Sequence, residues 1–175
     1  MKNRNRNIYS NYGVIAAALL AVITFDNLSG VFFGSLGTLA LIENIMRIML
    51  IAVLLMKLYS WVICVPFAFF AVTSFMHGND YVTSAFDAAL YVLTAVMCFI
   101  LLTDIMPDKV KDVTKRLFFV PSCLWLAYNA VIIAIFTNAE AVKTISYAIN
   151  IFMTLVFFAA HLFIGMWMAK PYKKD

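Results

Sequence analysis

The feature that most constrains this chain is its division into long apolar runs separated by short polar connections. Of the 175 residues, 65% are hydrophobic and 13% are charged, and the mean hydropathy is +0.94. An ordinary water-soluble domain carries about 25% charged residues. Since a helix needs about 20 residues to cross a bilayer, the sequence predicts an all-α integral membrane protein, with the lipid bilayer as its first partner.

The apolar runs predict six membrane-spanning helices that form one bundle within a single membrane domain, residues 1–175. Their expected ranges are 12–33, 36–56, 58–76, 84–106, 117–137 and 144–169. The end of the first helix has two interpretations, because a polar residue, Asp26, interrupts the run. The helix either continues through Asp26 to about Phe33, or ends near Leu28 while the next few apolar residues return to the membrane interface.

Lysine and arginine positions predict the orientation of this bundle, because short cytoplasmic loops retain positive charge and exported loops lose it. With six spans, the basic residues on one side are Lys2, Arg4, Arg6, Lys57, Lys109, Lys111, Lys115, Arg116, Lys170, Lys173 and Lys174. Only Lys143 falls on the other side, and Arg47 lies within the second helix. We therefore expect both termini in the cytoplasm and a location in the cytoplasmic (inner) membrane of a prokaryotic cell.

Two ionisable residues inside the second predicted helix are the strongest functional signal. Glu43 and Arg47 are four residues apart, with Asn44 beside the glutamate, so all three share one helical face. Ionisable groups at bilayer depth are costly and usually serve a pathway, a ligand or each other. The pair is therefore expected either to bind a substrate or to neutralise itself and hold its helix inside the bundle.

Further polar residues lie at a similar depth in other predicted helices. Tyr91, Asn129 and Asn150, like Glu43, are about six to eight residues from the exported end of their helix, or roughly 10 to 12 Å at 1.5 Å per residue. Together they would line a pocket open to the exported face; singly, such residues hydrogen-bond neighbouring helices. The predicted substrate-binding set is Glu43, Arg47, Asn44, Tyr91, Asn129 and Asn150.

No motif in the sequence predicts catalysis, a cofactor or a metal site. The three cysteines stand singly in apolar runs, without the paired spacing of zinc or redox sites. His77 and His161 lack the spacing of metal-binding helices, and neither a glycine-rich phosphate loop nor a nucleophile with its base is present. Membrane topology and anionic lipid account for the positive charge, so we expect no nucleic-acid partner.

These observations leave two function classes. The first is transport or substrate capture of a small polar molecule or ion through an outward-facing pocket, with the chain acting as a homo-oligomer or as the membrane subunit of a complex. The second is a non-transporting interaction or regulatory protein, whose basic loop 107–116 and C-terminal tail, KPYKKD, dock a cytoplasmic partner or anionic lipid. An enzyme acting on lipid would need His77 or His161 as its general base.

Overall fold

The computed structural model describes residues 2–32, 37–58, 60–76, 81–136 and 145–169, and within these ranges the secondary structure is helical, with no strand. The elements are α1 (Lys2–Phe32), α2 (Thr38–Leu55), the 3₁₀ helix η1 (Trp61–Ile63), α3 (Cys64–Thr73), α4 (Tyr81–Leu102), α5 (Asp108–Leu117), α6 (Val120–Phe136) and α7 (Ile145–Met168).

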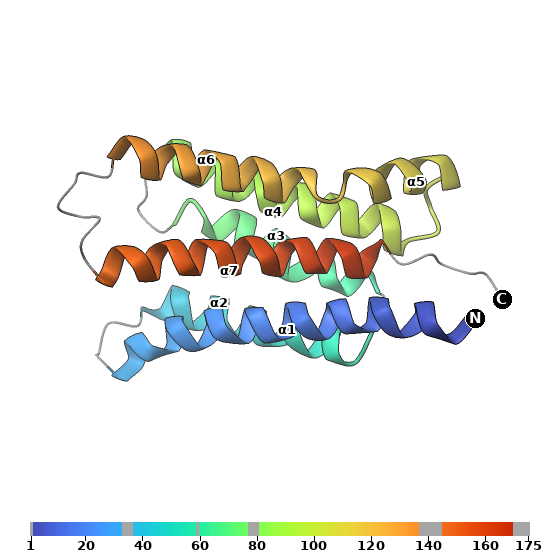
Figure 1. Cartoon of the computed structure of the whole chain (residues 1–175), viewed down its shortest axis with the longest axis horizontal. Coiled ribbons are helices and arrows are strands. Elements are labelled where there is room, and N and C mark those ends of the chain that lie inside the picture. The colour runs from blue at the N-terminus through green and yellow to red at the C-terminus, as the bar shows by residue number, and fades with distance from the viewer. Residues whose placement is uncertain (1, 33–36, 59, 77–80, 137–144, 170–175) are drawn as a thin grey trace.

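The long helices pack side by side in two layers, α1, α7 and α6 in one and α2, α3 and α4 in the other (Figure 1). Contacts close a ring, because α1 packs on α2 and α7, α2 on α3, α3 on α4, α4 on α6, and α6 on α7. The start of α1, the end of α7 and α5 lie together at one end of the bundle, called the terminal end below. The opposite end is called the far end.

Five stretches of the described residues are long and apolar enough to cross a membrane, and the third helical segment is apolar but shorter. The five are Asn11–Ser29, Thr38–Leu55, Tyr81–Leu102, Asp108–Ile135 and Tyr147–Met168, and the shorter one is Trp61–Thr73. Large apolar side chains on the outside, such as Phe25 at 74% and Val72 at 66% exposure, suit lipid better than water. The predicted all-helical architecture is confirmed, and it is compatible with a multi-pass membrane protein.

Small residues let α1 approach its neighbours closely. Ala16 and Ala17 of α1 and Ala160 of α7 are buried in the core. Gly13 lies against the indole of Trp167, so that a Cβ at this glycine would be only 2.7 Å from Trp167 Cδ1. Small side chains permit close contact between helix backbones in a membrane, and shape complementarity therefore holds α1 against α7.

The structure decides between the two interpretations of the first helix. α1 runs without a break through Asp26 to Phe32, as the longer alternative required, and Ser29 Oγ donates to the backbone oxygen of Asp26 at 2.6 Å. The predicted span from residue 12 agrees with the apolar stretch Asn11–Ser29, and the helix itself extends back to Lys2. The polar N-terminal residues contain no proline or glycine before Gly13, so the helix can extend beyond its apolar part.

The third segment is shorter than the predicted range 58–76. It begins with Ser60 capping η1 and its α-helix ends at Thr73. Before it, Lys57 adopts a left-handed φ of 56° and closes α2 through a bond from its own N–H to Leu54 O at 3.2 Å. Pro66 lies in the first turn of α3, where a missing N–H breaks no helical bond.

The predicted charged loop 107–116 is also wrong, because Asp108–Leu117 forms the helix α5. Asp108 in its first turn and Lys115 and Arg116 in its last turn oppose the charges of the helix dipole. The fourth helix begins at Tyr81, earlier than the expected 84. Residues 33–36, 77–80, 137–144 and 170–175 lie outside the described residues. They include most of the connections after the first, third and fifth predicted helices, and the KPYKKD tail.

Candidate functional site

The predicted pair on α2 is buried and interacts as its spacing requires. Glu43 is 5% and Asn44 1% exposed. Arg47 Nη2 lies 3.6 Å from Glu43 Oε2, and Arg47 Nη1 donates to Asn44 Oδ1 at 3.0 Å. One helical face therefore presents a carboxylate, an amide and a guanidinium to the interior of the bundle, five to nine residues from the start of α2 at the far end.

A fourth polar residue, Thr73, joins this cluster from the neighbouring helix. Thr73 Oγ1 donates to Glu43 Oε1 at 2.5 Å, while its distance to Phe70 O, the other acceptor in reach, is 3.3 Å. Thr73 is buried and is the last residue of α3. Sequence reasoning missed it, because a threonine in an apolar run carries no signal until the packing of α2 on α3 supplies its partner. We call Glu43, Asn44, Arg47 and Thr73 the polar cluster.

One donor of the polar cluster is unsatisfied. Within the described part of the chain, the buried Asn44 Nδ2 has no hydrogen-bond partner. The amide orientation follows from Arg47, because rotating the amide by 180° would point an N–H group at the guanidinium N–H. A buried donor without a partner costs about 1 to 3 kcal/mol. An oxygen acceptor placed beside Asn44 Nδ2 would therefore gain a hydrogen bond that no described residue provides.

Aromatic rings connect the polar cluster to Tyr91 in the centre of the bundle. Arg47 Cζ lies 5.4 Å from the centroid of the Phe70 ring, which is within the range of a cation–π contact. The ring centroids of Phe70 and Tyr91 are 5.3 Å apart, and those of Tyr91 and His161 are 5.8 Å apart. Tyr91 is therefore separated from the guanidinium by one ring, whereas the sequence predicted that it would share the pocket directly.

The structure does not bring Asn129 and Asn150 to the polar cluster. Asn129 Nδ2 donates to Trp125 O at 2.9 Å within its own helix, α6. Asn150 is exposed on the surface of α7. A count of residues from the helix ends concerns only depth along the bundle axis, and it contains no information on the direction in which each side chain points around its helix.

The remaining titratable residues do not add a catalytic or metal-binding constellation to the part of the chain that is described. His161 is buried, and its Nδ1 lies 2.9 Å from Phe157 O in the same helix, α7. Within the described ranges there is no group of three His, Cys, Asp or Glu side chains that could hold a metal ion. His77 and Asp80 lie outside these ranges.

No family model, no curated protein and no solved structure with which the chain was compared matches it. Fold and site therefore define only a class: an all-helical protein with five candidate membrane spans and a buried polar cluster between α2 and α3.

Proposed function

We propose that this chain is a six-span membrane protein with both termini in the cytoplasm, and that it binds a small polar or charged solute at the polar cluster during capture or transport across the cytoplasmic membrane. The observation that carries this proposal is the unsatisfied Asn44 Nδ2, buried beside the Arg47 guanidinium. Charged groups retained at bilayer depth generally serve a ligand or a pathway. Beside the Glu43 and Arg47 pair, the amide of Asn44 offers an unused N–H donor.

The positions of the basic residues support this topology. Lys2 begins α1, and Lys109 and Arg116 belong to α5. The start of α1 and the helix α5 both lie at the terminal end (Figure 1). The positive-inside rule assigns such an end to the cytoplasm. The third crossing would be made by Trp61–Thr73 and the residues flanking it, because this helical segment alone is shorter than the roughly 20 residues of a full span.

The donors and acceptors of the polar cluster indicate the kind of solute. Asn44 Nδ2 and the guanidinium of Arg47 offer N–H groups to an oxygen acceptor, and Glu43 offers carboxylate oxygens to a donor. In a low-dielectric interior such groups discriminate strongly against ligands that leave them unpaired. A solute with an oxygen acceptor, such as an amino acid, fits these groups better than an apolar solute or a bare metal ion.

Ligand-dependent thermal stability of the purified protein tests this proposal. A solute that binds only the folded state raises the apparent melting temperature, so wild type is screened against amino acids, other carboxylates, nucleobases and vitamins. We expect Asn44→Leu and Glu43→Gln to lose the shift. Asn129→Leu is the matched control, because its amide bonds only within α6. A shift that survives in both cluster variants would make the cluster purely structural.

α5 favours a second candidate function, the docking of a cytoplasmic partner protein. Its lysines and arginine are held on a folded helix at the terminal end, and a helix presents a more regular surface to a partner than a loop does. Mutations distinguish partner docking from solute binding. Neutralising Lys109 and Arg116 would abolish a docking function and leave solute binding intact, whereas Glu43→Gln would have the opposite effect.

A further inference from the structure

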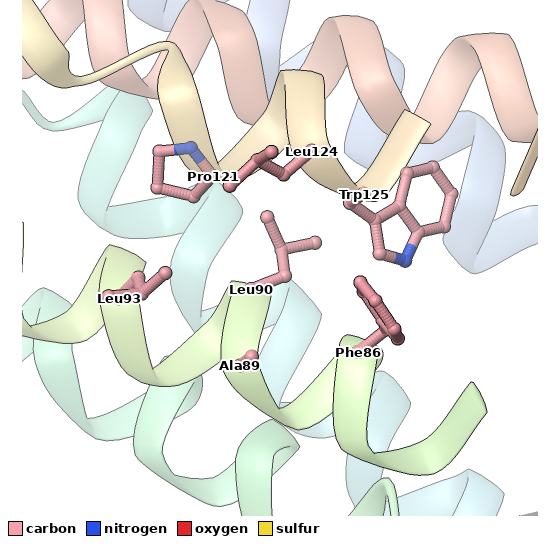
Figure 2. Close-up of a pocket in the computed structure, with 7 residues that line it drawn as sticks. All are labelled: Phe86, Ala89, Leu90, Leu93, Pro121, Leu124 and Trp125. Atoms are coloured by element: carbon pink, nitrogen blue, oxygen red, sulfur yellow. The ribbon is translucent and has the colours of Figure 1, made fainter. Parts of the chain in front are cut away.

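An apolar groove lies between α4 and α6, away from the polar cluster. Its cavity measures about 90 Å³ and is lined only by apolar residues and Trp125. In Figure 2, Leu90 and Leu93 of α4 face Pro121 and Leu124 of α6 across the gap. Leu93 and Leu124 are both exposed, so the groove opens on the outer surface of the bundle, where lipid would lie.

α5 presents an apolar stripe that leads toward this groove. Val110, Val113 and Leu117 are exposed on one face of α5, while Thr114 is buried and turns toward the packed side. α5 continues into α6 nearly in line (Figure 1). Val113, Leu117, Pro121 and Leu124 follow one another at intervals of four, four and three residues, which is the spacing of one helical face. The stripe and the groove therefore form one apolar track.

Two exposed cations flank this track at its α5 end. The other two basic residues of α5 are paired, Lys111 with Asp104 at 3.4 Å and Lys115 with Asp112 at 3.5 Å. Lys109 and Arg116 are exposed and make no ion pair with any residue of the described ranges. Arg116 precedes Pro121 by five residues, which is roughly 8 Å along a helix axis. Positive charge thus stands just beyond one end of an apolar groove.

We propose that the groove and α5 together form a binding site for an anionic glycerophospholipid, with an acyl chain in the groove and the phosphate at Arg116 and Lys109. The groove suits a short part of a hydrocarbon chain, because its volume is about 90 Å³ and its walls offer almost no polar atoms. A guanidinium binds phosphate oxygens through paired N–H donors, and unpaired cations at a membrane surface favour anionic over zwitterionic lipid. The proposal requires the membrane location argued above but not the solute site.

Native mass spectrometry of the purified full-length chain tests this site. The protein is equilibrated with equal amounts of phosphatidylglycerol and phosphatidylcholine that have the same acyl chains, and the retained lipids are counted. We expect wild type to retain phosphatidylglycerol preferentially. Lys109→Gln combined with Arg116→Gln should reduce this preference roughly tenfold. The matched control, Lys111→Gln with Lys115→Gln, removes the same amount of charge from the paired positions. This control should keep the preference for phosphatidylglycerol.

The acyl-chain part of the site is tested separately. Ala89, exposed and on the groove wall, is replaced by Phe to fill the cavity, and Leu93→Trp fills it from a second position in case the first variant does not fold. Both should lower retention of both lipids. Equal retention of the two lipids by wild type, an equal loss of preference in the control pair, or full retention by both groove-filling variants would each overturn the proposal.

Discussion

The hydroxyl of Thr73 donates a hydrogen bond to Glu43 Oε1 at 2.5 Å and so ties the end of α3 to the buried face of α2. A neutral donor from one helix thereby holds the carboxylate of another beside its arginine. This bond joins the two helices at the far end of the bundle, so it determines how firmly the polar cluster is assembled.

Removing this hydroxyl should therefore weaken the bundle. We expect Thr73→Val to lower the free energy of unfolding by about 1 kcal/mol, the scale of an interhelical hydrogen bond in a membrane protein, because Glu43 loses a donor. Thr73→Ser should retain most of the stability. The control is Thr24→Val, whose buried hydroxyl bonds to Leu20 O at 2.8 Å within α1. Unfolding is followed in detergent micelles, and equal losses at Thr73 and Thr24 would contradict the prediction.

Replacing only Arg47 should destabilise the protein more than replacing both Glu43 and Arg47. Arg47→Gln leaves the Glu43 carboxylate buried without its cation, which we expect to cost about 3 kcal/mol. The double variant Glu43→Gln with Arg47→Gln should be more stable than Arg47→Gln alone, because no buried charge is left unpaired. A double-mutant cycle measured by thermal unfolding gives the coupling. Strict additivity of the two substitutions would show that the pair does not interact.

The contact between Gly13 and Trp167 should tolerate no added methyl group. Gly13→Ala places a Cβ about 2.7 Å from the indole, and we expect a loss of about 1 to 3 kcal/mol, typical of overpacking. Ala18→Val, which adds bulk to an exposed position of the same helix, is the control. A smaller partner, Trp167→Leu, should partly rescue Gly13→Ala. Unchanged thermal stability of Gly13→Ala would mean that α1 and α7 are less closely packed.

Lys57 closes α2 in a left-handed conformation, with φ at 56°. This conformation costs a residue with a Cβ about 1 kcal/mol relative to glycine. Lys57→Gly is therefore expected to raise thermal stability, whereas Lys57→Ala, which loses the same charge but keeps a Cβ, is not. Equal effects of the two substitutions would attribute the change to the charge instead of the backbone.

Single-cysteine labelling tests the proposed topology. In a variant with the three native cysteines replaced by alanine, a cysteine at the exposed Tyr81, where α4 begins, should react with a membrane-impermeant maleimide in intact cells. A cysteine at the exposed Asp104, beyond the other end of α4, should react only after the cells are permeabilised. The reverse pattern would place the termini outside the cytoplasm.

The sequence predicted the parts of this fold that depend on long apolar runs. It failed where high charge and a helical apolar period occur in the same segment, and at helix ends. Long apolar runs predicted the long apolar helices that the structure contains. The many charges of residues 107–116 favour a loop, although Val110, Val113 and Leu117 follow the helical period that α5 shows. The helix ends at Lys57 and Ser60 depend on a left-handed residue and a cap, which composition does not reveal.

The same division applies to the site. The spacing of Glu43, Asn44 and Arg47 within one helix determined that they would meet, because residues three and four apart share a helical face whatever surrounds the helix. Only the tertiary structure decided that Thr73 joins the cluster, that Asn44 Nδ2 lacks a partner among the described residues and that Asn150 points outward. These facts depend on how each helix is rotated about its own axis, which is set by side-chain packing between helices.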